Sequence, residues 1–105
     1  MKHTFRLYVV TLHAQVWSVG AFARANKGKK GQCLYVGSTA HTPEHRFAQH
    51  KAGRFSNRGW VERFGLALAP HLSDGREYQT RESAEQAERA LAESLRRKGY
   101  AVWQR

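Results

Sequence analysis

The chain has 105 residues, of which 41% are hydrophobic and 11% aromatic; this suits one domain spanning residues 1–105 and excludes wholesale disorder. Eighteen Lys and Arg residues against eight Asp and Glu residues give a net charge of +10, which favours a polyanionic partner over a small metabolite. No apolar run reaches about 18 residues, so a membrane-spanning helix is excluded. The single cysteine, Cys33, cannot form an internal disulfide, and because an alternating segment follows the first residues directly, we expect no secretory signal. We therefore expect a cytoplasmic protein.

The positive charge is concentrated in the first part of the chain. Residues 1–60 contain ten basic residues and one acid, Glu44, whereas residues 61–105 contain eight basic and seven acidic residues. The net charges of these two parts are therefore +9 and +1. Such an uneven potential favours nucleic acid as the partner. We also expect a monomer or weak dimer without a membrane partner.

Two strands and a basic loop are predicted first. Residues 5–12 are rich in β-branched and aromatic side chains and predict a strand, and residues 32–37 predict a second one. Residues 24–31 between them are rich in lysine and glycine, which is typical of a flexible loop. An antiparallel hairpin with this loop at its tip is the simplest connection, and residues 17–22 would extend its first strand.

Helix signals begin at Thr42. With Thr42 as the N-cap and Pro43 at the first helical position, a helix is expected to run to about Lys51, where Gly53 closes it. Residues 57–64 predict a second short helix that begins at an asparagine cap.

The remaining elements complete a small α/β (α+β) fold. Residues 65–70 predict a third strand, which ends at a proline. The longest helix is predicted from its cap, Thr80, to Lys98, and residues 100–103 predict a short final strand or a docked tail. We therefore expect a small antiparallel β-sheet of about three strands, flanked by helices.

Glu88 is the acidic residue that needs an explanation. At about 100° per residue, it falls on the apolar stripe of the long helix, which consists of Ala84, Ala87, Leu91 and Leu95. A carboxylate among core positions is costly to desolvate unless it has a cationic partner or a metal. The sequence leaves both explanations open: Glu88 lies at the edge of the stripe and pairs with an arginine, or it binds a metal ion.

Other residues suited to phosphate chemistry precede it. Arg46 and His50 are four residues apart, so they share one face of the predicted helix. A guanidinium is suited to binding phosphate, and an imidazole can exchange protons near neutral pH. Tyr8 and Tyr35 lie centrally on the first two predicted strands, and Gly37 permits a close approach of the backbone. Taken singly, each residue also fits a solvated surface or core packing.

In this order the residues resemble the GIY-YIG nuclease superfamily. The match runs from about Phe5 to Trp103, and its most specific part is Tyr-Val-Gly-Ser-Thr at residues 35–39, followed by Arg-x-x-x-His at residues 46–50. The Gly-Ile of the family's first motif is here Arg-Leu at residues 6–7, and valine replaces the isoleucine of the second motif.

The resemblance implies an enzyme and a role for each matched residue. Tyr8 and Tyr35 match the tyrosines of the two motifs, Arg46 and His50 match the helical pair, and Glu88 matches the metal-binding glutamate. It implies an endonuclease that hydrolyses phosphodiester bonds in DNA rather than RNA, with a divalent ion, magnesium or manganese, held by the glutamate and water. The arginine would hold a phosphate oxygen, and one tyrosine, assisted by the histidine, would activate the water.

Several assignments stay open at this point. Glu85 is the alternative metal ligand, and either tyrosine could activate the water. Six basic residues are candidate contacts to the nucleic-acid backbone: Lys27, Lys29, Lys30, Lys51, Arg54 and Arg58. Trp17 or Trp60 would stack on a base, with packing in the core as the alternative for both.

Two other classes of function compete with the nuclease. No asparagine follows Glu88, although the family usually has one there, so a module that binds nucleic acid without cleaving it is the second hypothesis. The third hypothesis is a structural metal site built from Cys33, His41, His45 and His50.

Overall fold

The computed structural model describes residues 4–52 and 60–104, apart from the side chains of Trp60 and Glu62. Five strands form one sheet: β1 (Phe5–Leu12), β2 (Cys33–Thr39), β3 (Gly65–Leu68), β4 (Glu77–Tyr78) and β5 (Ala101–Gln104). Their order is β3-β1-β2-β5, and β4 also pairs with β1. The predicted α+β class is confirmed. The expected antiparallel sheet of about three strands is wrong in two respects, because five strands are present and β5 runs parallel to β2.

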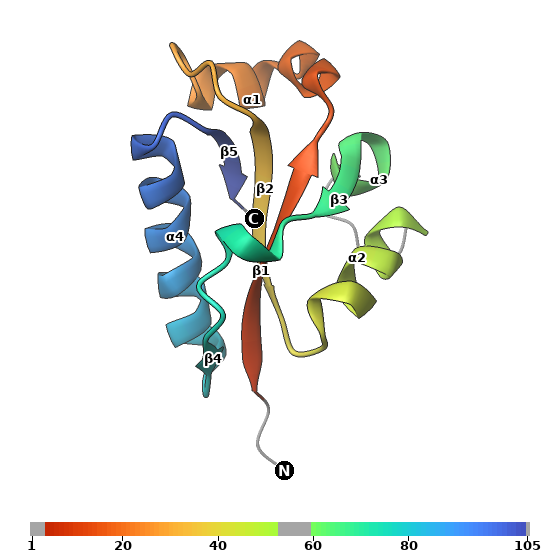
Figure 1. Cartoon of the computed structure of the whole chain (residues 1–105), viewed down its shortest axis with the longest axis vertical. Coiled ribbons are helices and arrows are strands. Elements are labelled where there is room, and N and C mark those ends of the chain that lie inside the picture. The colour runs from red at the N-terminus through yellow and green to blue at the C-terminus, as the bar shows by residue number, and fades with distance from the viewer. Residues whose placement is uncertain (1–3, 53–59, 105) are drawn as a thin grey trace.

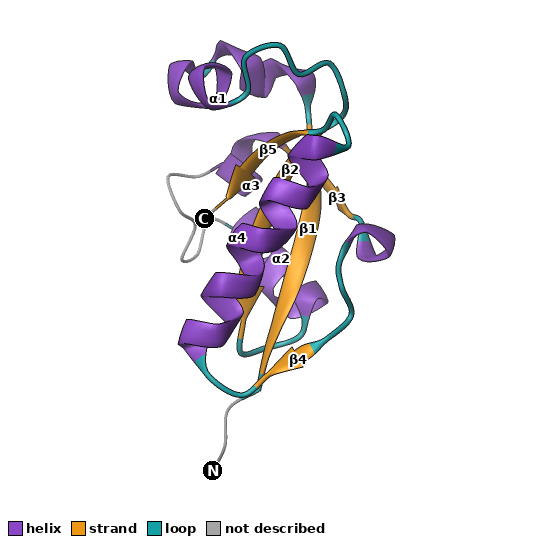
Figure 2. Cartoon of the chain, turned by 90° about the vertical axis from the view of Figure 1, so that its left-hand side faces the viewer, coloured by secondary structure: helices purple, strands orange, loops and turns teal. Residues whose placement is uncertain are grey.

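Helices cover both faces of this sheet. The α-helices are α1 (Gly20–Ala25), α2 (Pro43–Lys51), α3 (Trp60–Phe64) and α4 (Arg81–Arg97), and two short 3-10 helices are η1 (Ala14–Ser18) and η2 (Pro70–Leu72). Figure 1 shows α4 on one side of the sheet, α2 and α3 on the other, and α1 at one end of the molecule. Figure 2, turned by 90°, shows α4 running along the sheet in front of β1 and β2. None of the helices in the described part of the chain is long and apolar enough to span a membrane.

The two predicted main helices form where their capping signals lie. Thr42 accepts a hydrogen bond from the backbone N–H of His45 and caps α2, which ends at Lys51 as expected. Thr80 caps α4 in the same way through the backbone N–H of Ser83. The expected closing residue Gly53 and the expected cap Asn57 lie outside the described residues.

The segment between β1 and β2 differs from the prediction. Residues 17–22 do not extend the first strand, because η1 and α1 occupy residues 14–25. Val16 and Phe22 are fully buried in the core beside Tyr8 and Tyr35. A continued strand would carry these side chains past the end of the sheet, whereas two short helices fold them back onto it.

Strand register decides which residues face which helices. Tyr8 lies opposite Gly37 and Val10 opposite Tyr35, and the two tyrosines join the core cluster that α2 and α3 cover. The alternate residues, such as Val9, join a second cluster with Ala92 and Leu95 of α4. Strand β5 pairs with β2 only over residues 33–36. No described strand therefore covers Gly37–Thr39 on that side, and we call these three residues the open edge of β2.

Candidate functional site

The centre of the site is a contact between Tyr8 and His50. The Tyr8 hydroxyl oxygen lies 2.9 Å from Nε2 of His50, within hydrogen-bond distance. Strand β1 supplies the tyrosine and α2 the histidine, which are 42 positions apart in the chain. Both side chains are only 1% exposed. A phenol hydroxyl and an imidazole are therefore held within hydrogen-bond distance of each other in the buried part of the molecule.

Gly37 makes this contact possible. A Cβ atom at this position would lie 2.6 Å from the Tyr8 hydroxyl oxygen and 2.7 Å from the ring carbon Cζ. The ring of Tyr8 therefore lies directly across β2 at the glycine, where the hydroxyl reaches the open edge of β2. The close approach expected at Gly37 is made by a tyrosine from the neighbouring strand.

Replacing Gly37 with alanine is expected to lower the free energy of unfolding by about 1–3 kcal/mol, because the new methyl group overpacks the buried Tyr8 ring. Gly20→Ala is the matched control, since its Cβ would meet only the flexible guanidinium of Arg24. The measurement is equilibrium unfolding in urea, where the control should stay within about 0.5 kcal/mol of the parent. Equal stability of the two variants would contradict the close packing of Tyr8 on Gly37.

Tyr35 lies behind this pair. Its ring centroid is 6.2 Å from that of Tyr8 and 5.8 Å from that of His50, the latter in an edge-to-face arrangement. Tyr35 has no exposed surface in the described structure. The three rings form one cluster, in which Tyr8 is nearer to the open edge of β2.

Arg46 lines a surface hollow on the same side of the sheet. This hollow, of about 280 Å³, is called the arginine hollow and is lined by Ser38, Thr39, Ala40, His41, Arg46, Gln49 and Arg81. The guanidinium of Arg46 donates to Oε1 of Gln49 at 3.2 Å, one helical turn along α2. Two arginines from different helices thus line one depression, with the guanidinium of Arg81 lying over the ring of Phe5. Two such cations suit an anion such as phosphate.

Glu88 lines a second hollow on the α4 side. This one, of about 230 Å³, is called the glutamate hollow and is lined by Ser38, Glu85, Glu88, Arg89 and Gln104. Glu88 is 2% exposed and lies among the buried residues of α4, as the apolar stripe predicts. Oε1 of Glu88 lies 3.5 Å from the side-chain nitrogen of Gln104. No asparagine follows Glu88, but a glutamine amide from β5 reaches it.

The two hollows share a lining residue at the open edge of β2. Ser38 lines both of them, one extending toward α2 and the other along α4. The structure therefore brings Tyr8, Tyr35 and His50 into direct contact. It places Arg46 and Glu88 in adjoining depressions on either side of the same strand edge.

Sequence reasoning missed four residues of this region. They are Ser38, Gln49, Arg81 and Gln104, which line the hollows or contact the predicted site residues. A polar residue after a buried strand is a weak signal for Ser38. Helical spacing from Arg46 would have placed Gln49 beside it, whereas only the fold brings Arg81 and Gln104 to this edge.

The predicted metal ligands can be tested against the donor set. Glu88, Glu85, Ser38 and Gln104 line one hollow together with the cation Arg89, so the first four offer carboxylate, hydroxyl and amide oxygens there. Hard oxygen donors with room for water suit magnesium or manganese, which keep much of their hydration shell in proteins. The residues therefore fit such an ion, with Glu88 as the buried anchor and Glu85 as an exposed second carboxylate.

The predicted phosphate contacts do not form one surface. Lys27, Lys29 and Lys30 lie in the loop between α1 and β2. This loop is at the end of the molecule where α1 lies, away from α2 (Figure 1). Lys51 donates to the carbonyl oxygen of Gly65 at 3.0 Å.

The other predicted contacts have different outcomes. Arg54 and Arg58 lie outside the described residues, as does the side chain of Trp60. Trp17 packs edge-to-face on Phe22, with 5.1 Å between the ring centroids, so its contact in the structure is with the core.

The proposed structural metal site is not assembled. Cys33 begins β2, whereas His41 and His45 follow its other end, and His50 is engaged with Tyr8. Within residues 4–52 and 60–104, no group of three or more His, Cys, Asp or Glu side chains is arranged to hold a metal. Burial raises the pKa of the Cys33 thiol above its ordinary value, which also disfavours the thiolate that metal binding requires.

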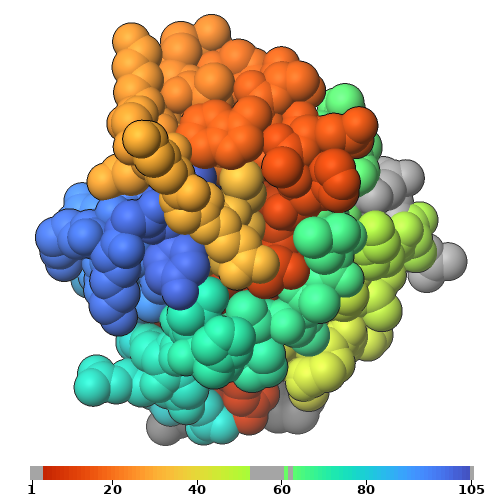
Figure 3. Space-filling view, turned by 45° about the horizontal axis from the view of Figure 1, so that its top comes forward, coloured from red at the N-terminus to blue at the C-terminus, as the bar shows by residue number. Residues whose placement is uncertain are grey.

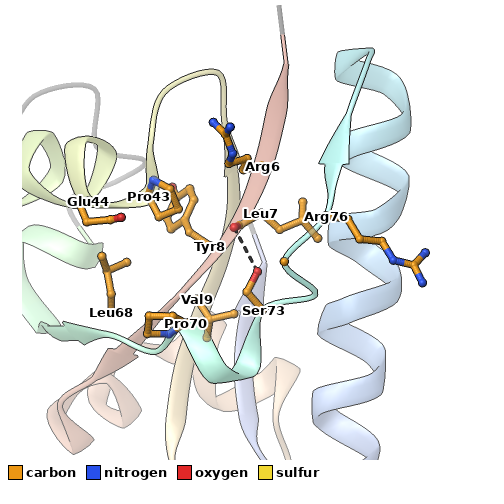
Figure 4. A pocket seen from close by; sticks show the side chains of 11 residues that line it. Arg6, Leu7, Tyr8, Val9, Pro43, Glu44, Leu68, Pro70, Ser73 and Arg76 are labelled. Atoms are coloured by element: carbon orange, nitrogen blue, oxygen red, sulfur yellow. Dashed lines mark hydrogen bonds between the residues drawn. The ribbon is translucent and has the colours of Figure 1, made fainter.

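A further hollow of about 170 Å³ lies on the other edge of β1 (Figure 4). It is bounded by Pro43 and Glu44 on one side and by Pro70 and Ser73 on another, and Ser73 donates to the carbonyl oxygen of Leu7. Tyr8 is the only one of the five predicted catalytic residues that lines it. Arg46 and Glu88 line the arginine hollow and the glutamate hollow instead.

Comparison with protein-family models, with curated proteins and with solved structures gave no match to this chain. The functional argument therefore depends on the geometry of the chain itself.

Proposed function

We propose that the protein is a metal-dependent endonuclease that hydrolyses phosphodiester bonds in DNA, as its resemblance to the GIY-YIG nucleases implies. The observation that carries this proposal is that the arginine and glutamate hollows share Ser38, which follows Gly37, where the ring of Tyr8 in the buried Tyr8–His50 pair packs. A cation-lined depression and a carboxylate-lined depression at one edge are what phosphodiester hydrolysis requires. The cytoplasm is part of the proposal, since the cysteine is unpaired.

Arg46 would bind a non-bridging oxygen of the scissile phosphate. Its guanidinium is oriented by Gln49, and Arg81 from α4 adds a second positive charge to the arginine hollow. Fixed cations that neutralise the charge developing on the phosphate lower the barrier most in a site that excludes water.

Tyr8 and His50 would handle the proton of the attacking water. A free tyrosine has a pKa of about 10 and is a poor base at neutral pH. With the hydroxyl held 2.9 Å from the imidazole, the phenolic proton can pass to Nε2 of His50 as the tyrosine oxygen accepts a proton from water. Tyr35 would hold both rings in place.

Glu88 would hold the divalent ion, with Gln104 orienting its carboxylate. When bound, such an ion supplies Lewis-acid polarisation of the phosphate and a lowered pKa for water. The lack of an asparagine after Glu88 is an argument against catalysis. The amide of Gln104 beside Glu88 weakens this argument.

The test is incubation of the purified protein with supercoiled plasmid and with branched duplex DNA, in magnesium, in manganese and in EDTA. We expect nicking or cutting in either metal and none in EDTA. Arg46→Ala should lower the rate by about 100-fold, whereas Arg63→Ala, an exposed arginine on α3 that lies over the ring of Phe64, should leave it unchanged. Absence of cleavage on every substrate would overturn the proposal.

The second candidate is a nucleic-acid-binding module without catalysis. It is favoured by one observation, the almost complete burial of Tyr8, Tyr35 and His50, which is also typical of side chains that only pack. It predicts salt-sensitive DNA binding that needs no metal, and sustained metal-dependent cleavage would rule it out.

A further inference from the structure

A second basic surface lies at the other end of the molecule. The loop between α1 and β2 packs against the C-terminal end of α4, and Figure 3 shows the two segments side by side. Together they carry six cationic residues, which we call the basic end: Lys27, Lys29, Lys30, Arg96, Arg97 and Lys98. These are a third of the Lys and Arg residues of the chain, so the charge of the protein has a second centre.

Specific contacts hold the basic end together. The backbone N–H of Gly31 donates to the carbonyl oxygen of Gly99 at 2.9 Å, and Lys29 donates to the carbonyl oxygen of Arg96 at 2.9 Å. A Cβ at Gly31 would lie 2.4 Å from the Gly99 oxygen, so glycine is required for this approach. The lysine also places its charge at the negative end of the α4 dipole. The loop is therefore docked onto the helix.

Docking leaves other cations directed at solvent. Lys27, Lys30, Arg97 and Lys98 are exposed. Within the described part of the chain, none of the six residues of the basic end lies within ion-pair distance of an acid. Lys29, Lys30 and Lys98 line one hollow of about 460 Å³, together with the half-buried ring of Tyr100. Cations around a concave surface that includes an aromatic ring are typical of nucleic-acid binding.

The basic end is separate from the candidate active site. Helix α4 has 17 residues, so its length is about 25 Å. Its first half lines the glutamate and arginine hollows, whereas Lys98 follows its last turn. The exposed acid Glu93 lies on α4 between the two regions. A phosphate backbone lying along the outside of α4 would meet this negative charge, so the two regions suit two different segments of nucleic acid.

We propose that the basic end is a second, non-catalytic nucleic-acid-binding surface, through which one molecule holds a duplex segment apart from the one at the active site. Nucleic acid fits better than an anionic membrane, because membrane binding also needs exposed apolar side chains. Leu66 of β3 is the only large hydrophobic residue exposed in the described structure, at 57%, and it is not part of the basic end. The proposal rests on the proposed function in one respect, that the ligand is a nucleic acid. It does not require the protein to cleave that nucleic acid.

The first experiment measures binding of a 30-base-pair fluorescent duplex in EDTA at several salt concentrations. It compares the parent protein, Lys30→Gln/Lys98→Gln, and the control Arg63→Gln/Arg76→Gln, which removes the same charge from exposed residues elsewhere. Each phosphate contact contributes about 0.9 to the slope of log K against log salt concentration. We expect the slope to become smaller by about 2 in the first variant, and by much less in the control. Equal losses in both variants would overturn the proposal.

The second experiment mixes a donor-labelled and an acceptor-labelled duplex with the parent protein. Energy transfer that disappears in Lys30→Gln/Lys98→Gln but persists in the control would show that the basic end holds a second duplex. No transfer with the parent protein would contradict the proposal. The proposal would also be contradicted if the basic end bound vesicles containing phosphatidylserine and did not bind DNA. A protein that binds through the basic end yet never cleaves would refute only the nuclease.

Discussion

Glu88→Gln is expected to lower metal-dependent cleavage of DNA by about 1,000-fold or more. Glutamine has the shape of glutamate but lacks the negative charge, and one of its terminal atoms donates hydrogen bonds instead of accepting them. Glu88 is the buried carboxylate of the glutamate hollow. Its negative charge is lost in the variant, and a water molecule that entered the hollow would not restore it. The measurement is the initial rate of plasmid nicking as a function of magnesium and manganese concentration.

Two further glutamates of α4 provide matched controls. Glu85 lines the same hollow but is exposed, and Glu93 is exposed on the same helix without lining it. We expect Glu85→Gln to reduce the rate by about 10-fold or less and to raise the metal concentration required, and Glu93→Gln to have no effect. A larger loss for Glu85→Gln than for Glu88→Gln would make Glu85 the principal ligand, as the sequence left open.

The same variants separate the two candidate functions. Unfolding in urea shows whether Glu88→Gln remains folded, and duplex binding in EDTA shows whether it still binds. A nuclease should keep its DNA affinity and lose its rate. A binding module should show neither metal-dependent cleavage in the parent protein nor a change of affinity in the variant. Full activity of a folded Glu88→Gln protein would refute the proposed mechanism.

The parts of the fold that could be predicted are those specified by neighbouring residues. A threonine cap followed by proline begins α2, and a threonine cap with an apolar stripe defines α4. The strand β4 has two residues and exists because Phe5 and Arg6 of β1 pair with it, so nothing in its own sequence indicates it. The Arg6 guanidinium also lies 2.6 Å from Glu77 of β4, which gives a structural use to one residue that departs from the GIY motif.

The candidate site could be predicted in its residues but not in its geometry. Spacing put Arg46 and His50 on one helix face and Glu88 on the buried side of another. Only the strand register reveals that the Tyr8 ring crosses Gly37 to meet His50. Likewise, the amide of Gln104 reaches Glu88 because β5 pairs with β2 in parallel, a long-range pairing that no local pattern encodes.

Asn26 is the other residue whose replacement should have a large effect, here on stability. It is 1% exposed and follows the last turn of α1. Its amide nitrogen donates to the carbonyl oxygens of Phe22 and Val102, each at 3.0 Å, and its side-chain oxygen accepts from the backbone N–H of Val102 at 2.8 Å. The side chain thus pairs with both backbone groups of Val102, as a neighbouring strand would, and connects α1 to β5.

Asn26→Ala is expected to lower the free energy of unfolding by about 2–4 kcal/mol, since it leaves the buried N–H of Val102 without its acceptor and removes two further hydrogen bonds. The carbonyl of Val102 would keep its bond from Arg96, at 2.9 Å, which limits the loss. Equilibrium unfolding in urea measures it, with Gln86→Ala, an exposed amide on α4, expected to change stability by less than about 0.5 kcal/mol. Asn26→Asp should also destabilise, because a carboxylate would face two carbonyl oxygens. If both Asn26 variants matched the control, Asn26 would not connect α1 to β5 in solution.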